Sequence, residues 1–152
     1  MNYWLMKTEP EVYSIDDLKK EKNQIEHWDG VRNYQARNMM RDAMKKGDQV
    51  FFYHSNCKVP GIVGVAKVVK TGYPDYTAFD PTSKYYDPKS SPDNPRWYMV
   101  DIKFLRKLKR TITLEELKQR QDIKDMPLVR NGNRLSVMPV TEQQWELILS
   151  LE

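Results

Sequence analysis

The sequence has very little cysteine, one residue (Cys57) in the whole chain. A single thiol excludes an intramolecular disulfide and is typical of a reducing compartment, so we expect a cytoplasmic protein. Long apolar runs are also missing, because no stretch approaches the ~20 residues that cross a bilayer. The apolar start at 1–7 is too short for a signal peptide. We therefore expect no membrane contact.

Residues that carry catalysis or bind metals are scarce as well. His27 and His54 are the two histidines, and His54 with Cys57 gives an H-x-x-C pattern that lacks the further ligands of a closed zinc site. No phosphate-binding glycine-rich loop, Walker pattern or dinucleotide fingerprint is present. We expect no metal, no cofactor and no enzymatic activity. One enzymatic alternative stays open, in which Cys57 and His54 form a nucleophile pair.

Tyrosine and tryptophan, by contrast, are abundant. The 152 residues include nine Tyr and four Trp, more than the core of one small domain requires. Lys and Arg number 25 against 21 Asp and Glu, and the net charge of +4 permits an anionic partner without requiring one. The chain has no internal repeat, low-complexity tract or linker, so we expect a single domain over 1–152.

The hydrophobic pattern predicts strands flanked by several short helices. Strands are expected at 3–7, 49–55, 61–71, 97–105 and 135–138, and helices after Ser14, over 33–46, after Thr113 and after Thr141. Side chains suited to cap these helices are Ser14, Asn33, Thr113 and Thr141. The segment 73–95 has no period, yet its aromatic side chains argue for order. The pattern indicates an α+β domain on a small, curved or closed sheet.

Trp28 is the aromatic residue that first suggests a binding site. It precedes a turn at Asp29 and Gly30, where the chain bends. An indole presented by a turn can stack on a nucleic-acid base, a contact that contributes ~1–3 kcal/mol. The alternative is that Trp28 fills the core beside Trp4, because large aromatic side chains pack more often than they bind.

Two groups of basic residues are candidates for phosphate contacts. The first lies along one side of the predicted helix, with Arg32 just before it: Arg37, Arg41 and Lys45. The second lies at the end of a predicted strand and in the turn after it, with no acid among its members: Lys103, Arg106, Lys107, Lys109 and Arg110. Phosphate contacts give affinity and salt dependence without sequence preference. Each group also has a structural interpretation, as a solvated helix face that Asp42 partly neutralises or as an edge strand that lysine protects from aggregation.

Six strings run through almost the whole chain in a characteristic order. They are YWLMKTEP (3–10), WDGVRNYQARN (28–38), FFYHSNC (51–57), YYDPK (85–89), PRW (95–97) and RLSVMPV (134–140). These strings resemble those of the EVE-domain family. The resemblance implies a PUA-like fold, a small β-barrel with short helices packed around it, related in design to YTH domains.

The same resemblance implies an aromatic pocket that holds a flipped, modified base, as YTH domains hold a methylated base. Trp28 corresponds to a wall of that pocket, and Asp29 is the candidate acceptor for an exocyclic amine. The expected base-pocket residues are Lys7, Thr8, Trp28, Asp29, Asn33, Tyr34, Ser55, Asn56, Tyr85 and Trp97. The expected phosphate-binding residues are Arg32, Arg37, Arg41, Lys45, Lys107, Lys109 and Arg110.

On this basis we expect a nucleic-acid-binding reader of modified DNA, with a modified cytosine as its base, acting as a monomer or weak homodimer. Three alternatives remain open: an RNA-binding PUA-like module, a small enzyme that acts on a nucleoside or amide in the same pocket, and a protein-interaction surface formed by the aromatic loop. The basic N-terminal extension of the family's nuclear members is missing. Nuclear targeting is therefore not expected, and a bacterial, cytoplasmic protein is.

Overall fold

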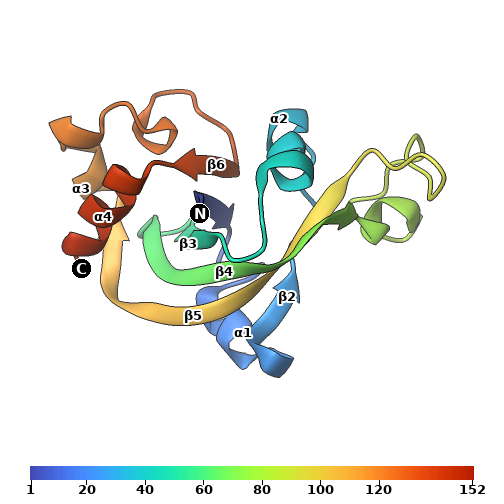
Figure 1. The fold of residues 1–152 in the computed structure, drawn as a ribbon, viewed down its shortest axis with the longest axis horizontal. Helices are drawn as coiled ribbons and strands as arrows, with labels where there is room; N and C mark the ends of the chain where they lie inside the picture. Colours follow the sequence, from blue (N-terminus) through green and yellow to red (C-terminus); the bar gives the residue numbers. More distant parts are fainter.

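The computed structural model describes residues 1–152 and is organised around one mixed sheet with the strand order β2-β5-β4-β3-β1-β6 (Figure 1). The strands are β1 (Tyr3–Thr8), β2 (Ile25–His27), β3 (Gln49–His54), β4 (Gly61–Pro74), β5 (Tyr98–Thr113) and β6 (Val137–Val140). The helices are α1 (Ile15–Lys20), α2 (Tyr34–Asn38), α3 (Leu114–Lys118) and α4 (Glu142–Ser150). Strands β1 and β3 pair in parallel, and the other pairings are antiparallel. None of the helices combines the length and the apolar character that crossing a membrane requires.

The parallel strands β1 and β3 lie inside the sheet and are buried on both faces. Their alternate residues join two separate hydrophobic clusters. Trp4, Met6, Val50 and Phe52 belong to the first cluster, and Leu5, Phe51 and Tyr53 belong to the second. Because side chains alternate between the faces of a sheet, a strand covered on both faces has an uninterrupted apolar sequence. This explains why neither strand shows the alternation of a half-exposed one.

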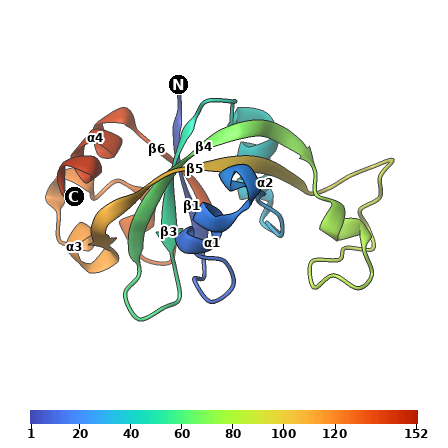
Figure 2. The same ribbon diagram turned by 90° about the horizontal axis from the view of Figure 1, so that it is seen from below.

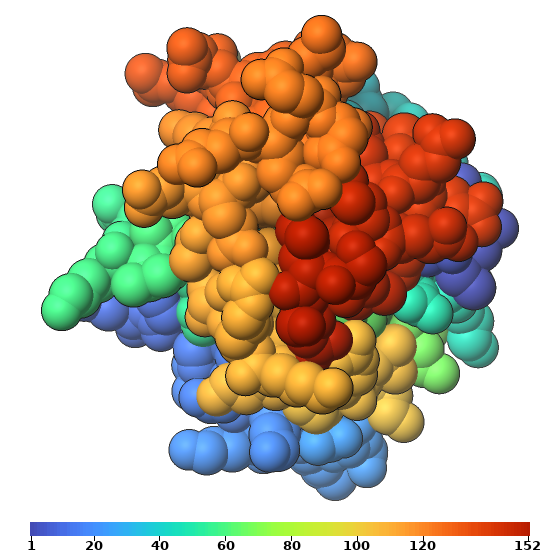
Figure 3. All heavy atoms as spheres, turned by 90° about the vertical axis from the view of Figure 1, so that its left-hand side faces the viewer, coloured from blue at the N-terminus to red at the C-terminus, as the bar shows by residue number.

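Helices from different parts of the chain cover the two faces. Ile15 of α1 and Ala36 of α2 pack in the first cluster. Leu117 of α3 and Trp145 of α4 pack in the second, where the Trp145 ring stacks on Phe51 with 3.8 Å between ring centroids. Figure 3 shows the segments from β5 to the end of the chain, in orange and red, packed together over this end of the molecule. The C-terminal third of the chain therefore forms one wall of the core.

Strands β4 and β5 form a long, curved ribbon that bends the sheet (Figures 1 and 2). They span 14 and 16 residues and shift register at several points, where β-bulges increase the local twist. The bend does not close the sheet, because β2 and β6 are its two edges and do not pair with each other. Strand β2 has three residues and bonds only to β5, while β6 has four and bonds only to β1. The predicted α+β class is confirmed, and the predicted closed barrel is wrong.

The helix starts that the sequence predicts are confirmed. Ser14, Thr113 and Thr141 each accept a hydrogen bond from the backbone N–H three residues later, and the residue at that position bonds back to complete a capping box. The Asn33 side chain accepts a hydrogen bond from the Ala36 N–H in the same way. These signals are local, so tertiary packing does not change them.

Several predicted boundaries are wrong. Helix α2 ends at Asn38 and continues as a π-helical turn over Met39–Ala43, short of the predicted end at 46. Strand β5 reaches Thr113, so the second basic group lies in a strand rather than partly in a turn. Strand β2 has no counterpart in the prediction, because three residues carry too little pattern. The segment 73–95 is ordered in part by a 3-10 turn over Tyr76–Phe79.

Candidate functional site

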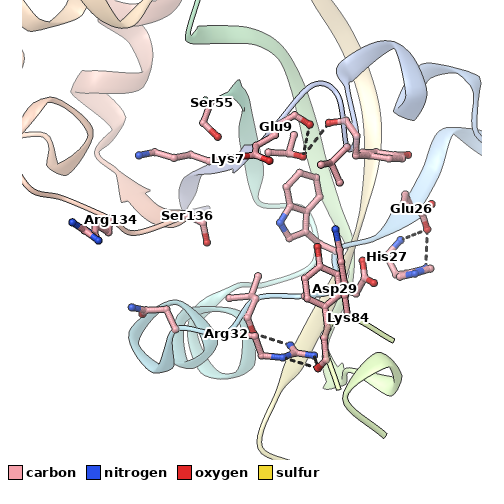
Figure 4. A pocket seen from close by; sticks show the side chains of 18 residues that line it. Lys7, Glu9, Glu26, His27, Asp29, Arg32, Ser55, Lys84, Arg134 and Ser136 are labelled. Carbon is pink, nitrogen blue, oxygen red and sulfur yellow. Dashed lines mark hydrogen bonds and ion pairs between the residues drawn. The ribbon is translucent and has the colours of Figure 1, made fainter. Parts of the chain in front are cut away.

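A pocket of about 750 Å³ opens beside the C-terminal ends of the interior strands β1 and β3. Because these strands are parallel, their last residues meet, and the Ser55 N–H donates to the Thr8 carbonyl at 2.9 Å. The lining comes from residues within 7–13, 26–33, 84–85 and 134–136, together with Ser55 (Figure 4). The pocket therefore joins five segments that are far apart in the sequence.

Trp28 is both a core residue and a pocket residue. It belongs to the same cluster as Trp4, is 8% exposed, and packs edge-to-face on Phe52 with 5.5 Å between ring centroids. Its indole N–H has no partner within the chain, yet no buried side-chain nitrogen or oxygen lacks a hydrogen bond. The indole N–H must therefore reach the pocket surface. The core interpretation of Trp28 is confirmed, since it packs in the same cluster as Trp4. Trp28 also lines the pocket, and stacking on a base there stays a prediction.

Tyr85 forms a second aromatic wall, and Gly30 makes room for it. A Cβ added at Gly30 would lie 2.6–2.8 Å from three carbon atoms of the Tyr85 ring, which is closer than real Cβ contacts. Gly30 also has φ of +80°, a conformation that residues with a side chain rarely adopt. Only glycine allows the Tyr85 ring to lie against the backbone of the turn after Trp28.

Arg32 fixes the Tyr85 loop in this position. Its Nε and Nη2 donate to the Tyr85 carbonyl at 3.1 and 2.7 Å. Its Nη1 donates to the Val31 carbonyl and to the Asp75 carboxylate at 2.9 and 3.0 Å, and Nη2 also donates to the Thr77 hydroxyl. The Asp75 side chain is fully buried and also accepts from the Gly30 N–H at 2.8 Å. All five N–H groups of Arg32 thus have partners within the chain, which leaves no free donor for a phosphate in this structure.

The charged residues of the pocket are distributed unevenly over its two sides. Figure 4 shows Lys7 and Arg134 with Ser55 and Ser136 on one side, which we call the basic side, and Glu26, His27 and Asp29 on the other, the acidic side. Each side also has one residue of the opposite charge: Glu9, whose carboxylate accepts from the Asn56 amide, lies beside Lys7, and Lys84 lies beside Asp29. Burial lowers the pKa of the Lys7 ammonium and raises the pKa of the Glu26 carboxyl. The pocket therefore destabilises the charged form of both groups, which a ligand with complementary charge would stabilise.

Some polar side chains of the pocket form hydrogen bonds within the protein, and others do not. The Thr8 hydroxyl donates to the Tyr13 carbonyl at 3.0 Å, and the Asn33 carbonyl oxygen caps α2. The side chains of Asp29 and Ser55 line the pocket and make no hydrogen bond within the chain. The polar side-chain atoms of Asp29 and Ser55 are therefore free for a ligand, as is the ammonium of Lys7.

Three of the predicted pocket residues lie outside the pocket. The Trp97 indole donates to Asp87 at 2.7 Å, and its ring stacks on Tyr34 with 4.7 Å between centroids. The Asn56 amide donates to Glu9 at 2.6 Å, which ties the β3–β4 turn to the loop after β1. Tyr34, Asn56 and Trp97 do not line this pocket, so the structure does not bring them together with the other predicted pocket residues.

Most of the predicted phosphate-binding cations have acidic or carbonyl partners within the chain. Arg110 directs its five N–H groups to Glu116 and to the carbonyls of Thr111 and Leu151. Further pairs are Lys107 with Asp16, Arg106 with Glu152, Arg41 with Asp42, and Arg37 with Asn38 and the Arg96 carbonyl. The basic group on β5 contains no acid in sequence, but the fold brings acids from α1, α3 and the chain end to it. Lys45 and Lys109 take part in no ion pair, and of the predicted phosphate-binding cations only Arg32 lines the pocket.

The pocket also contains residues that were not predicted, chiefly Arg134, Ser136, Glu26 and Tyr13. A signal for the first two existed, since they lie within a string that carries the family resemblance. His54 and Cys57 are not in the lining. The His54 Nε2 accepts the Ile15 N–H at 3.1 Å, so its acceptor nitrogen supports the start of α1 rather than activating a thiol. No three His, Cys, Asp or Glu side chains gather as metal ligands would.

The fold and the pocket define an α+β binding domain of the PUA-like class. Within that class the chain belongs to the EVE domain family, whose family model matches residues 2–151. Thymocyte nuclear protein 1 of Mus musculus is 51% identical to this chain over 168 aligned residues, which cover 99% of this chain and 74% of the mouse protein.

Two solved structures show how closely the fold is shared. A protein of Pseudomonas syringae is 52% identical and matches with a TM-score of 0.93 over 98% of both chains. The human THYN1 protein in complex with 5-methylcytosine containing DNA is 47% identical, with a TM-score of 0.89 over 99% of this chain and 97% of the human one. The family that the sequence strings indicate is therefore confirmed.

Proposed function

We propose that the protein binds DNA that carries a modified cytosine, holds the modified base in the pocket beside Trp28, and catalyses no reaction on it. The observation that carries this proposal is the human THYN1 protein, which is 47% identical over 99% of this chain and was solved in complex with 5-methylcytosine containing DNA. The pocket of about 750 Å³ supports it, because small-molecule sites typically enclose ~300–1,000 Å³.

The lining suits an extruded base. Extruding a base from the duplex costs roughly a few kcal/mol of stacking and pairing free energy, which contacts in the pocket must offset. The Trp28 indole and the Tyr85 ring offer apolar surface in place of the neighbouring bases. The free carboxylate of Asp29 accepts the exocyclic amine of cytosine, and the Ser55 hydroxyl bonds to the base edge. A methyl group on the base adds apolar area next to Val31, which is also in the lining.

The test is a comparison of affinities for matched oligonucleotides. Each carries one cytosine, 5-methylcytosine, 5-hydroxymethylcytosine or methylated adenine, in DNA and in RNA, at near-physiological salt. We expect at least a tenfold preference, ~1.4 kcal/mol, for a modified cytosine in DNA. Equal affinity for all DNA oligonucleotides would refute the proposal, and a stronger preference within the RNA series would assign the pocket to RNA instead.

Two variants connect the preference to the pocket. Trp28→Ala removes the indole wall and should abolish the preference, but Trp28 is also a core residue. Asp29→Asn is the companion variant, because the Asp29 side chain has no partner within the chain and its loss should leave folding intact. We expect Asp29→Asn to reduce affinity for modified cytosine while thermal unfolding stays unchanged. Full discrimination in both variants would place the base elsewhere on the protein.

A further inference from the structure

We propose that Lys7 and Arg134 hold a phosphate of the bound nucleotide, so that the base enters the pocket with its amine-bearing edge toward Asp29 and Glu26. The inference rests on the proposed function and goes beyond it, because it assigns the charged contacts and the orientation of the nucleotide. It also replaces Arg32 and the β5 cations as the phosphate ligands nearest to the base.

Lys7 is a cation without a carboxylate partner in a half-buried position. It occupies the end of β1, lines the pocket, and has the Tyr53 ring 5.6 Å from its Nζ. Burial lowers its pKa, and no acidic side chain within the chain pairs with it. A half-buried cation gains from an anion more than an exposed one does, because less water competes for it. An anionic ligand in the pocket would supply the missing charge.

Arg134 reaches the same side of the pocket from a different part of the chain. The segment before β6 runs beside β1, where the Lys7 N–H donates to the Ser136 carbonyl at 2.8 Å. Arg134 is exposed and makes no ion pair, unlike Arg32 and Arg110, whose N–H groups are all occupied. A free guanidinium can bind a phosphate through two parallel hydrogen bonds. Figure 4 shows Lys7 and Arg134 on the same side of the pocket, away from Asp29.

The acidic side of the pocket determines the opposite end of the ligand. Glu26 and Asp29 favour an N–H donor over a phosphate at this end. Asp29 is the freer of the two, because Glu26 already accepts from the His27 N–H at 2.9 Å, and Lys84 is the one cation beside them. A nucleotide with a phosphate toward Lys7 and Arg134 therefore directs an exocyclic amine toward the two carboxylates. Cytosine and adenine derivatives carry that amine, whereas thymine and uracil present a carbonyl oxygen at the corresponding position. The arrangement selects for amine-bearing bases before any modification is recognised.

The experiment uses oligonucleotides with one 5-methylcytosine in which the linkage on its 5′ or its 3′ side is an uncharged methylphosphonate. We expect one of the two neutral linkages to weaken binding to the intact protein by about tenfold, as the loss of a charge-assisted contact should. Arg134→Gln and Lys7→Gln should each weaken binding to the normal oligonucleotide and become insensitive to that linkage. Lys109→Gln is the matched control, because it removes an unpaired cation outside the pocket and should keep the full linkage effect.

The outcomes separate this inference from the proposed function. If the neutral linkage weakens binding to Arg134→Gln as much as it weakens binding to the intact protein, the inference is overturned. In that case the affinity lost through the substitution and the affinity lost through the linkage are independent, whether or not the intact protein prefers 5-methylcytosine. If the intact protein shows no preference for 5-methylcytosine over cytosine, the proposed function is refuted instead. Arg134 is exposed, so its variant should unfold at the temperature of the intact protein. The inference therefore remains testable even if the half-buried Lys7 variant is less stable.

Discussion

Replacement of Gly30 by alanine tests whether the Tyr85 wall depends on the absence of a side chain. The new Cβ would lie 2.6 Å from the Tyr85 ring and would also hold a residue with a side chain at φ of +80°. The left-handed backbone costs about 1–2 kcal/mol. Overpacking a rigid contact adds about 1–3 kcal/mol. We expect Gly30→Ala to lose about 2–5 kcal/mol of unfolding free energy.

Gly47→Ala is the matched control for the backbone cost. Gly47 has φ of +96°, but nothing lies within 4 Å of a Cβ added there. It should therefore lose only the backbone contribution, about 1–2 kcal/mol. Urea denaturation measures both variants, with the midpoint shifted and the slope unchanged if each remains two-state. The difference between the two variants isolates the contact with Tyr85.

A second substitution shows whether Tyr85 causes that difference. In a Tyr85→Ala background the ring is absent, so Gly30→Ala should cost no more than Gly47→Ala does. The affinity for a 5-methylcytosine oligonucleotide should fall in Gly30→Ala and stay unchanged in Gly47→Ala, because only the first displaces a pocket wall. Equal loss of stability in the two single variants would falsify the steric argument.

Three further predictions follow from the polar contacts. Asp75→Asn should lower the free energy of unfolding by about 3 kcal/mol in urea denaturation, because an amide replaces the buried carboxylate that accepts from the N–H groups of Gly30 and Arg32. A variant as stable as the wild-type protein would show that this contact is unimportant. Thr141→Ala should cost about 1 kcal/mol through loss of the α4 cap, with DNA affinity unchanged because the cap lies outside the pocket. The hydrogen bonds from Arg110 hold the pKa of the Glu116 carboxyl at about 2, below the ordinary value of 4.5. The ionised Glu116 therefore contributes fully to the free energy of unfolding above pH 4.5, and this contribution is lost as the pH falls toward 2. Glu116→Gln should flatten the stability curve across that window, and an unchanged acid midpoint would contradict the assignment.

Signals that depend on a few neighbouring residues could be predicted from the sequence alone. The helix starts at Ser14, Thr113 and Thr141 are examples, since the cap hydroxyl and the acid or amide three residues later each accept from the backbone N–H of the other residue. The strings that carry the family resemblance also identify the family and the part of the chain around Trp28. The short strand β2 and the end of α2 could not be predicted, because packing against other elements determines them.

The sequence also indicates that Trp28 has two possible roles, but it cannot choose between them. Burial and access to a pocket are properties of the whole fold, which packs one side of the indole on Phe52 and leaves its N–H open. The same limit applies to Arg32, whose partner Asp75 is 43 positions away in the sequence. No local pattern shows that its donors are all occupied.

The sequence by itself determined the composition of the site: aromatic rings, cations and hydroxyls in strings of a known family. The tertiary structure alone decided which charges are free. Arg110 and Lys107 belong to the densest basic segment of the sequence, yet each forms an ion pair, because the fold brings Glu116 and Asp16 to them. Lys7 and Arg134 are isolated in sequence and meet at one pocket, because β6 returns beside β1. Charge pairing depends on distance in three dimensions, and the order of residues along the chain does not contain that distance.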